Sequence, residues 1–305
     1  MERILISGVD STLGANFAAA LETVGEVPVL RGAAAPPSRA VAERLNELAT
    51  LLDEERPAAA IHCGPLSVSS WDPRAVTRHE LSHELEFVSG LVTMCGEREL
   101  PVGVLTTDGL FAGPRMFHDE EPTSYAASPW ADAARRLEQA AMAPRALVIR
   151  AHAYCLAANE AQSGVVDTFW NALTAGRAFD ADTQRHATPI LAHDLAHLVR
   201  DMLRRGAAGL YHLSGGERTS PYRLACELAT LAGAPGELAR PVDAQIAGQR
   251  VEETSLNTAA ARRQLGRPMP LLREGLERFV ELARGDFRER VARHVHSATL
   301  EKQAA

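Results

Sequence analysis

The chain has 305 residues and a formal net charge of −7, with 46% hydrophobic and 23% charged residues. These values are ordinary for a soluble globular protein, and the length suits one large α/β domain or a nucleotide-binding domain with a smaller second lobe. An acidic chain has no basic excess for non-specific nucleic-acid binding, and no apolar run approaches the roughly 18 residues that span a bilayer.

Short apolar runs alternate with helical stretches over the first 150 residues. Strands are predicted at Arg3–Ser7, Val27–Leu30, Ala59–Cys63, Val102–Thr106 and Ala146–Arg150. Helices are predicted between them at Leu13–Val24, Ser38–Glu55, Pro73–Arg98 and Trp130–Ala143. This alternation is typical of a parallel sheet with helices on both faces, so we expect an α/β fold of the Rossmann type.

The spacing becomes irregular after residue 155. Helices are predicted around Gly164–Ala175, His193–Arg205, Pro221–Ala232 and Leu271–Ala283, with short β-like pieces at Pro189–Leu191 and Gly209–Ser214. The remaining C-terminal residues are predicted to form a polar, charged tail. We expect a nucleotide-binding domain over residues 1–155, completed by parts of 185–215. A smaller α/β substrate-binding lobe is expected over 156–300, not fully separable from the first domain.

A glycine-containing loop, Gly8–Gly14, follows the first strand and opens the first helix. Such loops let backbone N–H groups and a helix N-terminus approach a pyrophosphate. Ser11 stands where the middle glycine is usual, so a tight turn without a ligand remains an alternative. Arg31 ends the second strand where an acidic residue would favour NAD; an arginine suits a 2′-phosphate and favours NADP(H). The predicted cofactor residues are Gly8, Ser11, Thr12, Leu13, Gly14, Arg31, Cys63 and Gly64.

Several segments together resemble the dTDP-4-dehydrorhamnose reductases and their sugar-nucleotide-binding relatives within the extended short-chain dehydrogenases. They are residues 4–14, 56–63, 104–111, 144–150, 187–196 and 209–215. The resemblance implies a cofactor in the first domain, a substrate in the C-terminal lobe, and catalysis by a hydroxyl residue, a tyrosine and a lysine. Thr107 matches the hydroxyl residue. Counting back from Glu138 places Trp130 at the tyrosine and Ala134 at the lysine, so ordinary carbonyl reduction is not expected.

Other polar residues are predicted to gather at the carboxyl ends of the strands, where open α/β sheets bind ligands. His152 is the favoured acid or base, because imidazole titrates near neutral pH. A histidine that only bonds to its surroundings is the alternative. The predicted catalytic set is Thr107, Asp108, Tyr125 and His152. The predicted substrate-binding set is His62, Trp130, Tyr154 and Arg250.

His79-Glu-Leu-Ser-His83 is a literal HExxH motif, which on a helix presents two histidines as zinc metallopeptidases do. It falls within a crossover helix of the nucleotide-binding domain, so a solvated or interfacial helix face is the better interpretation. We therefore expect no metal. The four cysteines form no CxxC pair, and the N-terminus has no signal-peptide pattern. These features predict a cytoplasmic protein.

Three functions remain open, and the first is favoured because histidines are predicted to gather at the strand ends. The first is non-redox chemistry on a small molecule, such as cyclisation, isomerisation or elimination, in secondary-metabolite or sugar-nucleotide biosynthesis. The second is a catalytically inactive nucleotide-binding subunit that regulates a partner enzyme. The third is an NADPH-dependent ketoreductase whose proton donor has moved to Tyr125. The resemblance also implies a homodimer formed through the helices Pro73–Arg98 and Trp130–Ala143.

Overall fold

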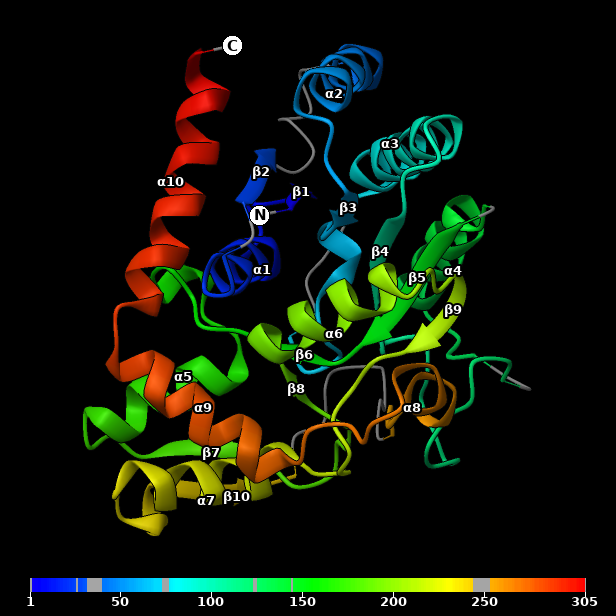
Figure 1. Cartoon of the computed structure of the whole chain (residues 1–305). Coiled ribbons are helices and arrows are strands. Elements are labelled where there is room, and N and C mark those ends of the chain that lie inside the picture. Colours follow the sequence, from blue (N-terminus) through cyan, green and yellow to red (C-terminus); the bar gives the residue numbers. More distant parts are fainter. Residues whose placement is uncertain are drawn as a thin grey trace.

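The computed structural model describes residues 2–25, 27–31, 40–72, 77–122, 125–143, 145–243 and 253–304, with the backbone alone at 27–31 and 297–304. A six-stranded parallel sheet in the order β2-β1-β3-β4-β5-β9 forms its centre (Figure 1). The α/β prediction of the Rossmann type is therefore confirmed. The strands are β1 (Arg3–Ser7), β2 (Val27–Arg31), β3 (Ala59–His62), β4 (Val102–Thr107), β5 (Ala146–Ala151) and β9 (Gly209–His212).

Helices cover both faces of this sheet. One face carries α1 (Thr12–Glu22) and α6 (Ala192–Arg204), and the other carries α2 (Val41–Glu55), α3 (Arg78–Glu97) and α4 (Pro129–Ala141). Side chains alternate between the two layers: Ile4 and Ile6 pack with α1 and α6, whereas Leu5 packs with α2 and α3. Both faces are apolar, which explains why the strands form continuous hydrophobic runs in the sequence.

The helix predicted at Pro73–Arg98 begins later, at Arg78, and residues 73–76 lie outside the described residues. Thr77 caps it: its hydroxyl accepts from the N–H of Glu80, whose carboxylate accepts from the N–H of Thr77. This reciprocal capping box fixes the start of α3.

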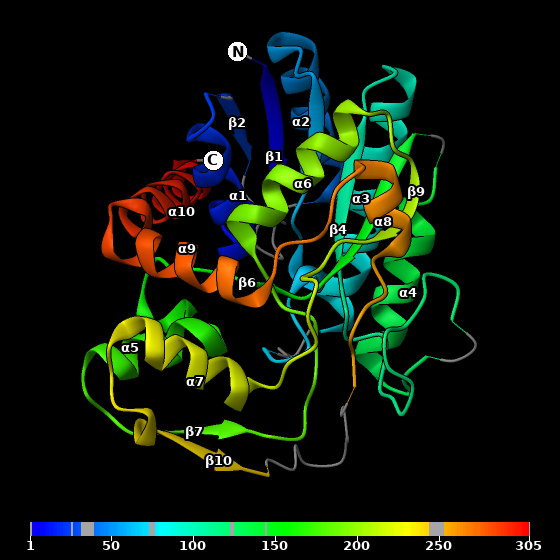
Figure 2. The same cartoon turned by 60° about the horizontal axis from the view of Figure 1, so that its bottom comes forward.

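A second group of elements lies together at one end of the sheet (Figure 2). It contains α5 (Val165–Thr174), α7 (Pro221–Ala232), α9 (Leu272–Arg284) and the parallel pair β7 (Phe179–Asp182) and β10 (Ala239–Val242). The short strands β6 (Ala153–Tyr154) and β8 (Ile190–Leu191) pair beside it, and α8 (Ala259–Leu265) packs against α6. The sequence did not predict β6, β7, β10 or α8.

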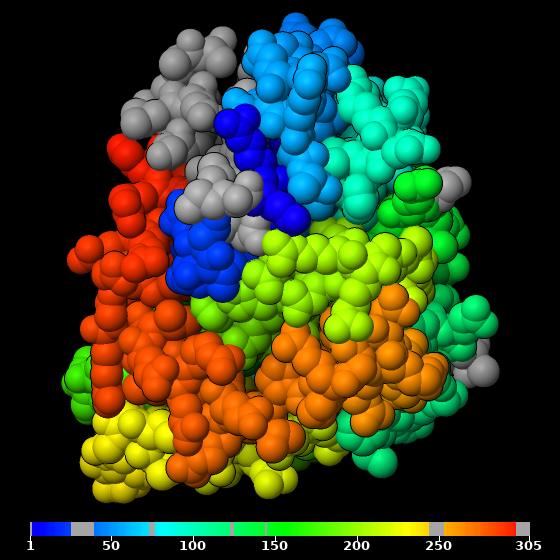
Figure 3. Space-filling view, in the orientation of Figure 1, coloured from blue at the N-terminus to red at the C-terminus, as the bar shows by residue number. Residues whose placement is uncertain are grey.

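The C-terminal segment is a helix, α10 (Phe287–Ala304), where the sequence predicted only a polar, charged tail. Phe287 and Val291, one helical turn apart, are buried in the core shared with α1. Figure 3 shows α1 (blue) between α10 (red) and α6 (yellow-green) on one side of the molecule. A narrow apolar stripe is thus enough to hold an otherwise polar helix against the body. None of the described helices is both long and apolar enough to span a membrane.

Candidate functional site

The loop between β1 and α1 packs tightly against the chain after β3. Gly8 has a φ of +89°, and a Cβ there would lie 2.1 Å from the carbonyl oxygen of Cys63. A Cβ on Gly14 would lie 2.1 Å from the carbonyl oxygen of Gly8. The Ser11 hydroxyl donates to Gly8 O over 2.6 Å and accepts from Gly14 N over 3.0 Å. Ser11 therefore acts as the N-cap of α1, and the loop keeps the geometry with which helix N-termini approach anions.

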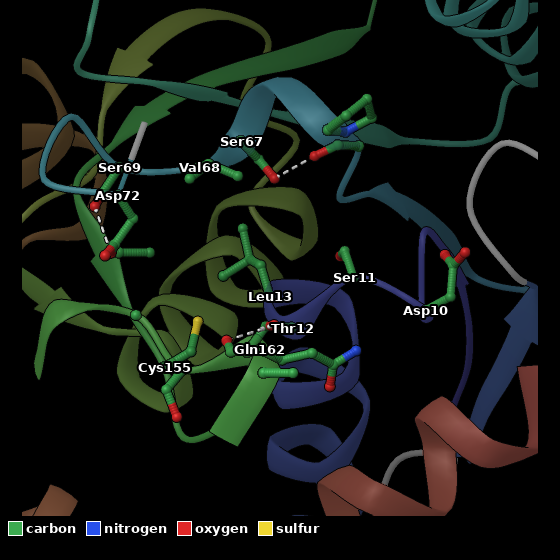
Figure 4. Close-up of a pocket in the computed structure, with 16 residues that line it drawn as sticks. Asp10, Ser11, Thr12, Leu13, Ser67, Val68, Ser69, Asp72, Cys155 and Gln162 are labelled. Atoms are coloured by element: carbon green, nitrogen blue, oxygen red, sulfur yellow. Dashed lines mark hydrogen bonds between the residues drawn. The ribbon is translucent and has the colours of Figure 1, made fainter. Parts of the chain in front are cut away.

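A cavity of about 370 Å³ lies beside this loop (Figure 4). Its walls come from three parts of the chain: the loop itself, the segment after β3, and the segment that leads from β6 into α5. The lining residues are Asp10, Ser11, Thr12, Leu13, Gly64, Pro65, Ser67, Val68, Ser69, Asp72, Ala153, Cys155, Ala161, Gln162, Ser163 and Gly164. Its size and mixed lining are those of a small-molecule pocket.

Four predicted cofactor residues line this cavity, namely Ser11, Thr12, Leu13 and Gly64. Gly8 and Gly14 lie behind it and give the loop its shape. Cys63 is also behind it and fully buried, and burial raises the pKa of its thiol well above the ordinary value. The backbone of Arg31 ends β2, but its side chain lies outside the described residues.

Asp72 joins the wall after β3 to the N-terminus of α5. Its Oδ1 accepts the backbone N–H of Val165 over 2.6 Å, and its Oδ2 accepts the Ser69 hydroxyl over 3.1 Å. Burial is the largest influence on this carboxyl group and raises its pKa, although the hydrogen bond from Val165 opposes the change. Asp72 thus serves as an internal anion at the start of a helix that has no cap from its own N-cap residue, Gly164.

His152 and Asp108 form a buried pair at the ends of β5 and β4. Nδ1 of His152 lies 2.7 Å from Oδ2 of Asp108, which also accepts the hydroxyls of Ser70 at 2.6 Å and Thr254 at 2.5 Å. The rings of His152 and Trp71 meet edge to face, 4.5 Å apart. Burial alone would raise the pKa of Asp108, but the imidazole and the hydrogen bonds outweigh it and the pKa is lowered. The pair is buried, and Ser70 and Trp71 pack directly against it.

Thr107 is fully buried, and protein groups already engage its hydroxyl. Its Oγ1 accepts the N–H of Gly109 over 2.9 Å and donates to Oδ1 of Asp108 over 3.4 Å. A hydroxyl that polarises a substrate carbonyl must direct its proton at the substrate. In this arrangement the proton is directed at Asp108 instead.

Tyr125 lies in a separate cluster around Arg150. The Arg150 guanidinium is buried and bonds to both carboxylate oxygens of Glu138, at 2.7 and 2.8 Å, and its Nη2 lies 3.5 Å from the Tyr125 hydroxyl. Nη1 of Arg150 lies 3.2 Å from Nε2 of His212, and burial together with this cation lowers the pKa of His212 to about 3. Among the described residues, Tyr125 makes no hydrogen bond to Thr107, Asp108 or His152 that would place it in the same site.

Residues 1–284 match the protein family described as "RmlD substrate binding domain". The chain belongs to this family. The match includes the pocket and the Asp108–His152 pair but ends before α10 begins. The comparison with curated proteins gave no match.

Solved structures share the fold of this RmlD-family chain. A hypothetical dTDP-4-dehydrorhamnose reductase from Sulfolobus tokodaii is 22% identical over 86% of this chain and 94% of that chain, with a TM-score of 0.68. The dTDP-4-dehydrorhamnose reductase of Bacillus anthracis, in complex with NADP, is 17% identical over 92% and 99%, with a TM-score of 0.73. The dTDP-glucose 4,6-dehydratase of the same organism, in complex with NAD, is 13% identical over 94% and 98%, with a TM-score of 0.72. At these identities the likeness shows a common fold.

Trp130 and Ala134, which the resemblance predicts to stand in place of the family's tyrosine and lysine, lie on α4. The Trp130 indole packs over Gly109, where a Cβ would approach its Cδ1 and Nε1 to 2.9 Å. Ala134 is buried against Leu110 and Phe111. Trp130 is therefore next to the Thr107 turn, and no side chain from position 134 reaches the pocket.

The other predicted substrate residues are dispersed. His62 is buried, with Nε2 2.7 Å from Glu84 Oε1 and Nδ1 3.2 Å from Ser7 Oγ. Tyr154 is buried against Phe279, away from the cavity lining, and burial raises the pKa of its phenol. Arg250 lies outside the described residues.

The HExxH histidines occupy the first turns of α3, and the rings of His79 and His83 lie 3.9 Å apart. In the described ranges, no group of three or more histidine, cysteine or carboxylate side chains is arranged to hold a metal ion.

Three polar residues of this region were not predicted from the sequence: Ser70, Asp72 and Thr254. Ser70 and Thr254 are common residue types in loops, so the sequence offers no signal for them. Asp72 ends a run of small and apolar residues after a buried strand, and that position could have marked it as a ligand-facing carboxyl group.

Proposed function

We propose that the chain binds a nucleotide that carries a diphosphate, with NADP(H) as the first candidate, and does not reduce carbonyl groups. The nucleotide-bound chain acts as a regulatory or scaffolding subunit of a biosynthetic enzyme whose substrates are sugar nucleotides or related small molecules. The NADP and NAD complexes of the B. anthracis proteins support the choice of ligand. The family match supports the link to sugar-nucleotide chemistry.

One observation carries this proposal: the cavity is lined by the Ser11 loop and not by Thr107, Asp108 or His152. The binding part of the site is open, whereas Thr107, Asp108 and His152 are hydrogen-bonded to one another and buried. In an enzyme active site, by contrast, polar groups are directed at the positions that the reacting atoms of the substrate will occupy.

Calorimetric titration of NADPH, NADH and a sugar nucleotide into the purified chain tests the binding step. Ser11→Asp keeps an acceptor for the Gly14 N–H, loses the hydroxyl that donates to Gly8 O and Cys63 O, and places a negative charge where the phosphates would lie. We expect it to weaken binding by about tenfold or more, and circular dichroism melting checks that the variant is folded. Thr77→Asp makes the same kind of change at the exposed N-cap of α3 and should leave binding unchanged. If none of the nucleotides binds at millimolar concentration, the proposal is wrong.

A second candidate function has one observation in its favour, the 2.7 Å contact between His152 and Asp108. Such a pair could move protons in a non-redox reaction if the segment that holds Ser70 and Trp71 opened. Incubation of a sugar nucleotide with the protein in D2O would show proton abstraction as exchange of a ring C–H for C–D, whatever product is formed. Exchange that is lost in His152→Gln and kept in His118→Gln would favour this enzyme over the binding protein.

The ketoreductase with Tyr125 as donor remains a prediction. It requires oxidation of NADPH in the presence of a carbonyl substrate and loss of that activity in Tyr125→Phe.

A further inference from the structure

The cavity beside the Ser11 loop is bounded by two helix N-termini. Ser11, the N-cap of α1, lines it at one place, and Gly164, the N-cap of α5, lines it at another. Two aspartates also line it and lie far apart, with Asp10 and Asp72 on opposite sides of the close-up (Figure 4). None of the described lining residues is a lysine, an arginine or a histidine. Attraction for an anion at this wall therefore comes from backbone N–H groups.

The two helix N-termini differ in one respect. The N-terminus of α1 is capped by the neutral Ser11 hydroxyl, whereas the first N–H of α5 is bound by the Asp72 carboxyl over 2.6 Å. The position at α5 that could receive a ligand's negative group already holds an internal one. Among the described residues, the titratable groups that act on Asp72 are the Arg185 guanidinium, the His152 imidazole and the Cys155 thiol.

Asp72 still has acceptor capacity. Each of its oxygens takes one hydrogen bond, from Val165 and from Ser69, and a carboxylate can accept about four in all. Groups that can use the remaining sites are donors such as a carboxamide N–H or a sugar hydroxyl. A carboxylate or a second phosphate at this wall would face a like charge, because Arg185 and His152 act on Asp72 from outside the lining and no basic side chain lines the cavity itself.

We propose that Asp72 sets the class of ligand that the cavity accepts: a nucleotide whose diphosphate lies at α1 and whose far end is neutral and donates hydrogen bonds. This inference rests on the proposed nucleotide binding and adds to it the identity of the charge-selecting residue. Asp72 excludes ligands with an acidic far end by repulsion and by occupying the N-terminus of α5.

Two matched pairs of compounds test the inference by calorimetry at about pH 8, chosen several units above the ordinary pKa of an aspartate because burial raises the pKa of Asp72. The first pair is NADP+ and nicotinic acid adenine dinucleotide phosphate, which differ in a carboxamide and a carboxylate. The second pair is UDP-glucose and UDP-glucuronate, which differ in a hydroxymethyl group and a carboxylate. The wild-type chain should bind the neutral-ended member at least about tenfold more tightly in the pair that fits the cavity.

Asp72→Asn is the diagnostic variant, because an asparagine of the same shape can still accept the N–H of Val165 and pair with the Ser69 hydroxyl. It should bring the two members of the pair to within about threefold of each other, mainly by tighter binding of the acidic member. Asp132→Asn, at an exposed position on α4, should keep the wild-type ratio. Circular dichroism melting checks that each variant is folded.

The outcomes separate the inference from the function on which it rests. Binding of both members of a pair with equal affinity by the wild type, or an unchanged ratio in Asp72→Asn, overturns the role of Asp72 and leaves nucleotide binding intact. Binding of no member of either pair, by wild type or variant, overturns both. The assignment is supported if the wild type shows a large affinity ratio between the two members of a pair, and if this ratio is lost in Asp72→Asn but kept in Asp132→Asn.

Discussion

The imidazole of His152 and the carboxyl group of Asp108 lie 2.7 Å apart in a region that water does not reach. Each is supplied by the end of a different central strand, and Ser70 and Thr254 complete the hydrogen bonding from outside the sheet. This hydrogen-bonded cluster links four segments of the chain, so it contributes to the stability of the fold whether or not it takes part in catalysis.

We expect His152→Leu to lower the free energy of unfolding by about 1.5–3 kcal/mol at neutral pH, because a buried carboxylate loses a hydrogen bond. The pKa of Asp108 is lowered in the folded chain, so the stabilisation is present above about pH 4 and is lost as the pH falls through the lowered value. Urea denaturation of wild type and variant at several pH values measures this difference. A gap between the two that does not narrow in acid would contradict the assignment.

The pH dependence between about 6.5 and 4 should come largely from one buried and one half-buried histidine, His212 and His197. The pKa of His212 is about 3 and that of His197 about 4, both depressed first by burial, so the native state stays neutral while the unfolded chain takes up protons below about 6.5. Stability should therefore fall with acidification, by about 1.4 kcal/mol per pH unit for each group. His212→Gln should reduce the slope of stability against pH by the contribution of one histidine, about 1.4 kcal/mol per pH unit. His79→Gln, at an exposed position, should leave the slope unchanged. Equal slopes in the two variants would refute the prediction.

Trp130 fills space that a side chain at position 109 would need. Gly109→Ala should destabilise the chain by about 1–3 kcal/mol, because the new Cβ would lie 2.9 Å from the indole. The same change in a Trp130→Ala background should cost little, so a double-mutant cycle in urea gives the coupling. Gly103→Ala is the matched control, since its Cβ would meet nothing nearer than 3.5 Å. Additive effects of the two changes would show that the indole is not the obstacle.

Arg288 connects α10 to the chain that borders the cavity. It bonds to the fully buried carboxylate of Asp167 at 2.6 and 3.2 Å and to the carbonyl of Ala157 at 2.6 Å. Arg288→Met should increase hydrogen exchange of the backbone over residues 157–167 and destabilise the fold by about 1.5–3 kcal/mol. Arg290→Met, which removes a solvent-exposed pair with Asp286 just before α10, should change stability by less than about 0.5 kcal/mol. Similar exchange in the two variants would argue against this connection.

The first half of the fold could be predicted from the sequence to within a residue at most strand ends. The strand predicted at Ala146–Arg150, for example, runs to Ala151. Such strands are easy to predict, because a strand that is buried on both faces forms a continuous apolar run in the sequence. The strands β7 and β10 were missed: Phe179–Asp182 and Ala239–Val242 are short, half polar and paired only through tertiary contact. The helix α10 was missed because its apolar residues are few, although their spacing at 287, 291 and 295 follows a helix.

The candidate site was predictable in its parts and not in its arrangement. Thr107, Asp108 and His152 were each singled out because they follow buried strands. The sequence could not show that Asp108 accepts a hydrogen bond from the Thr107 hydroxyl and also pairs with the imidazole of His152, since those contacts depend on how far the strands are offset. Whether these residues catalyse anything stays a prediction.

The strand β9 has a consequence for how the chain is made. It pairs with β5 through Leu147–Arg150, yet it lies well beyond β5 in the sequence. A ribosome releases the first five strands of the sheet long before the sixth, so the nascent chain exposes an unpaired apolar edge during that interval. An N-terminal fragment ending at residue 155 would keep this edge permanently. We expect it to aggregate, because unpaired strand edges template association.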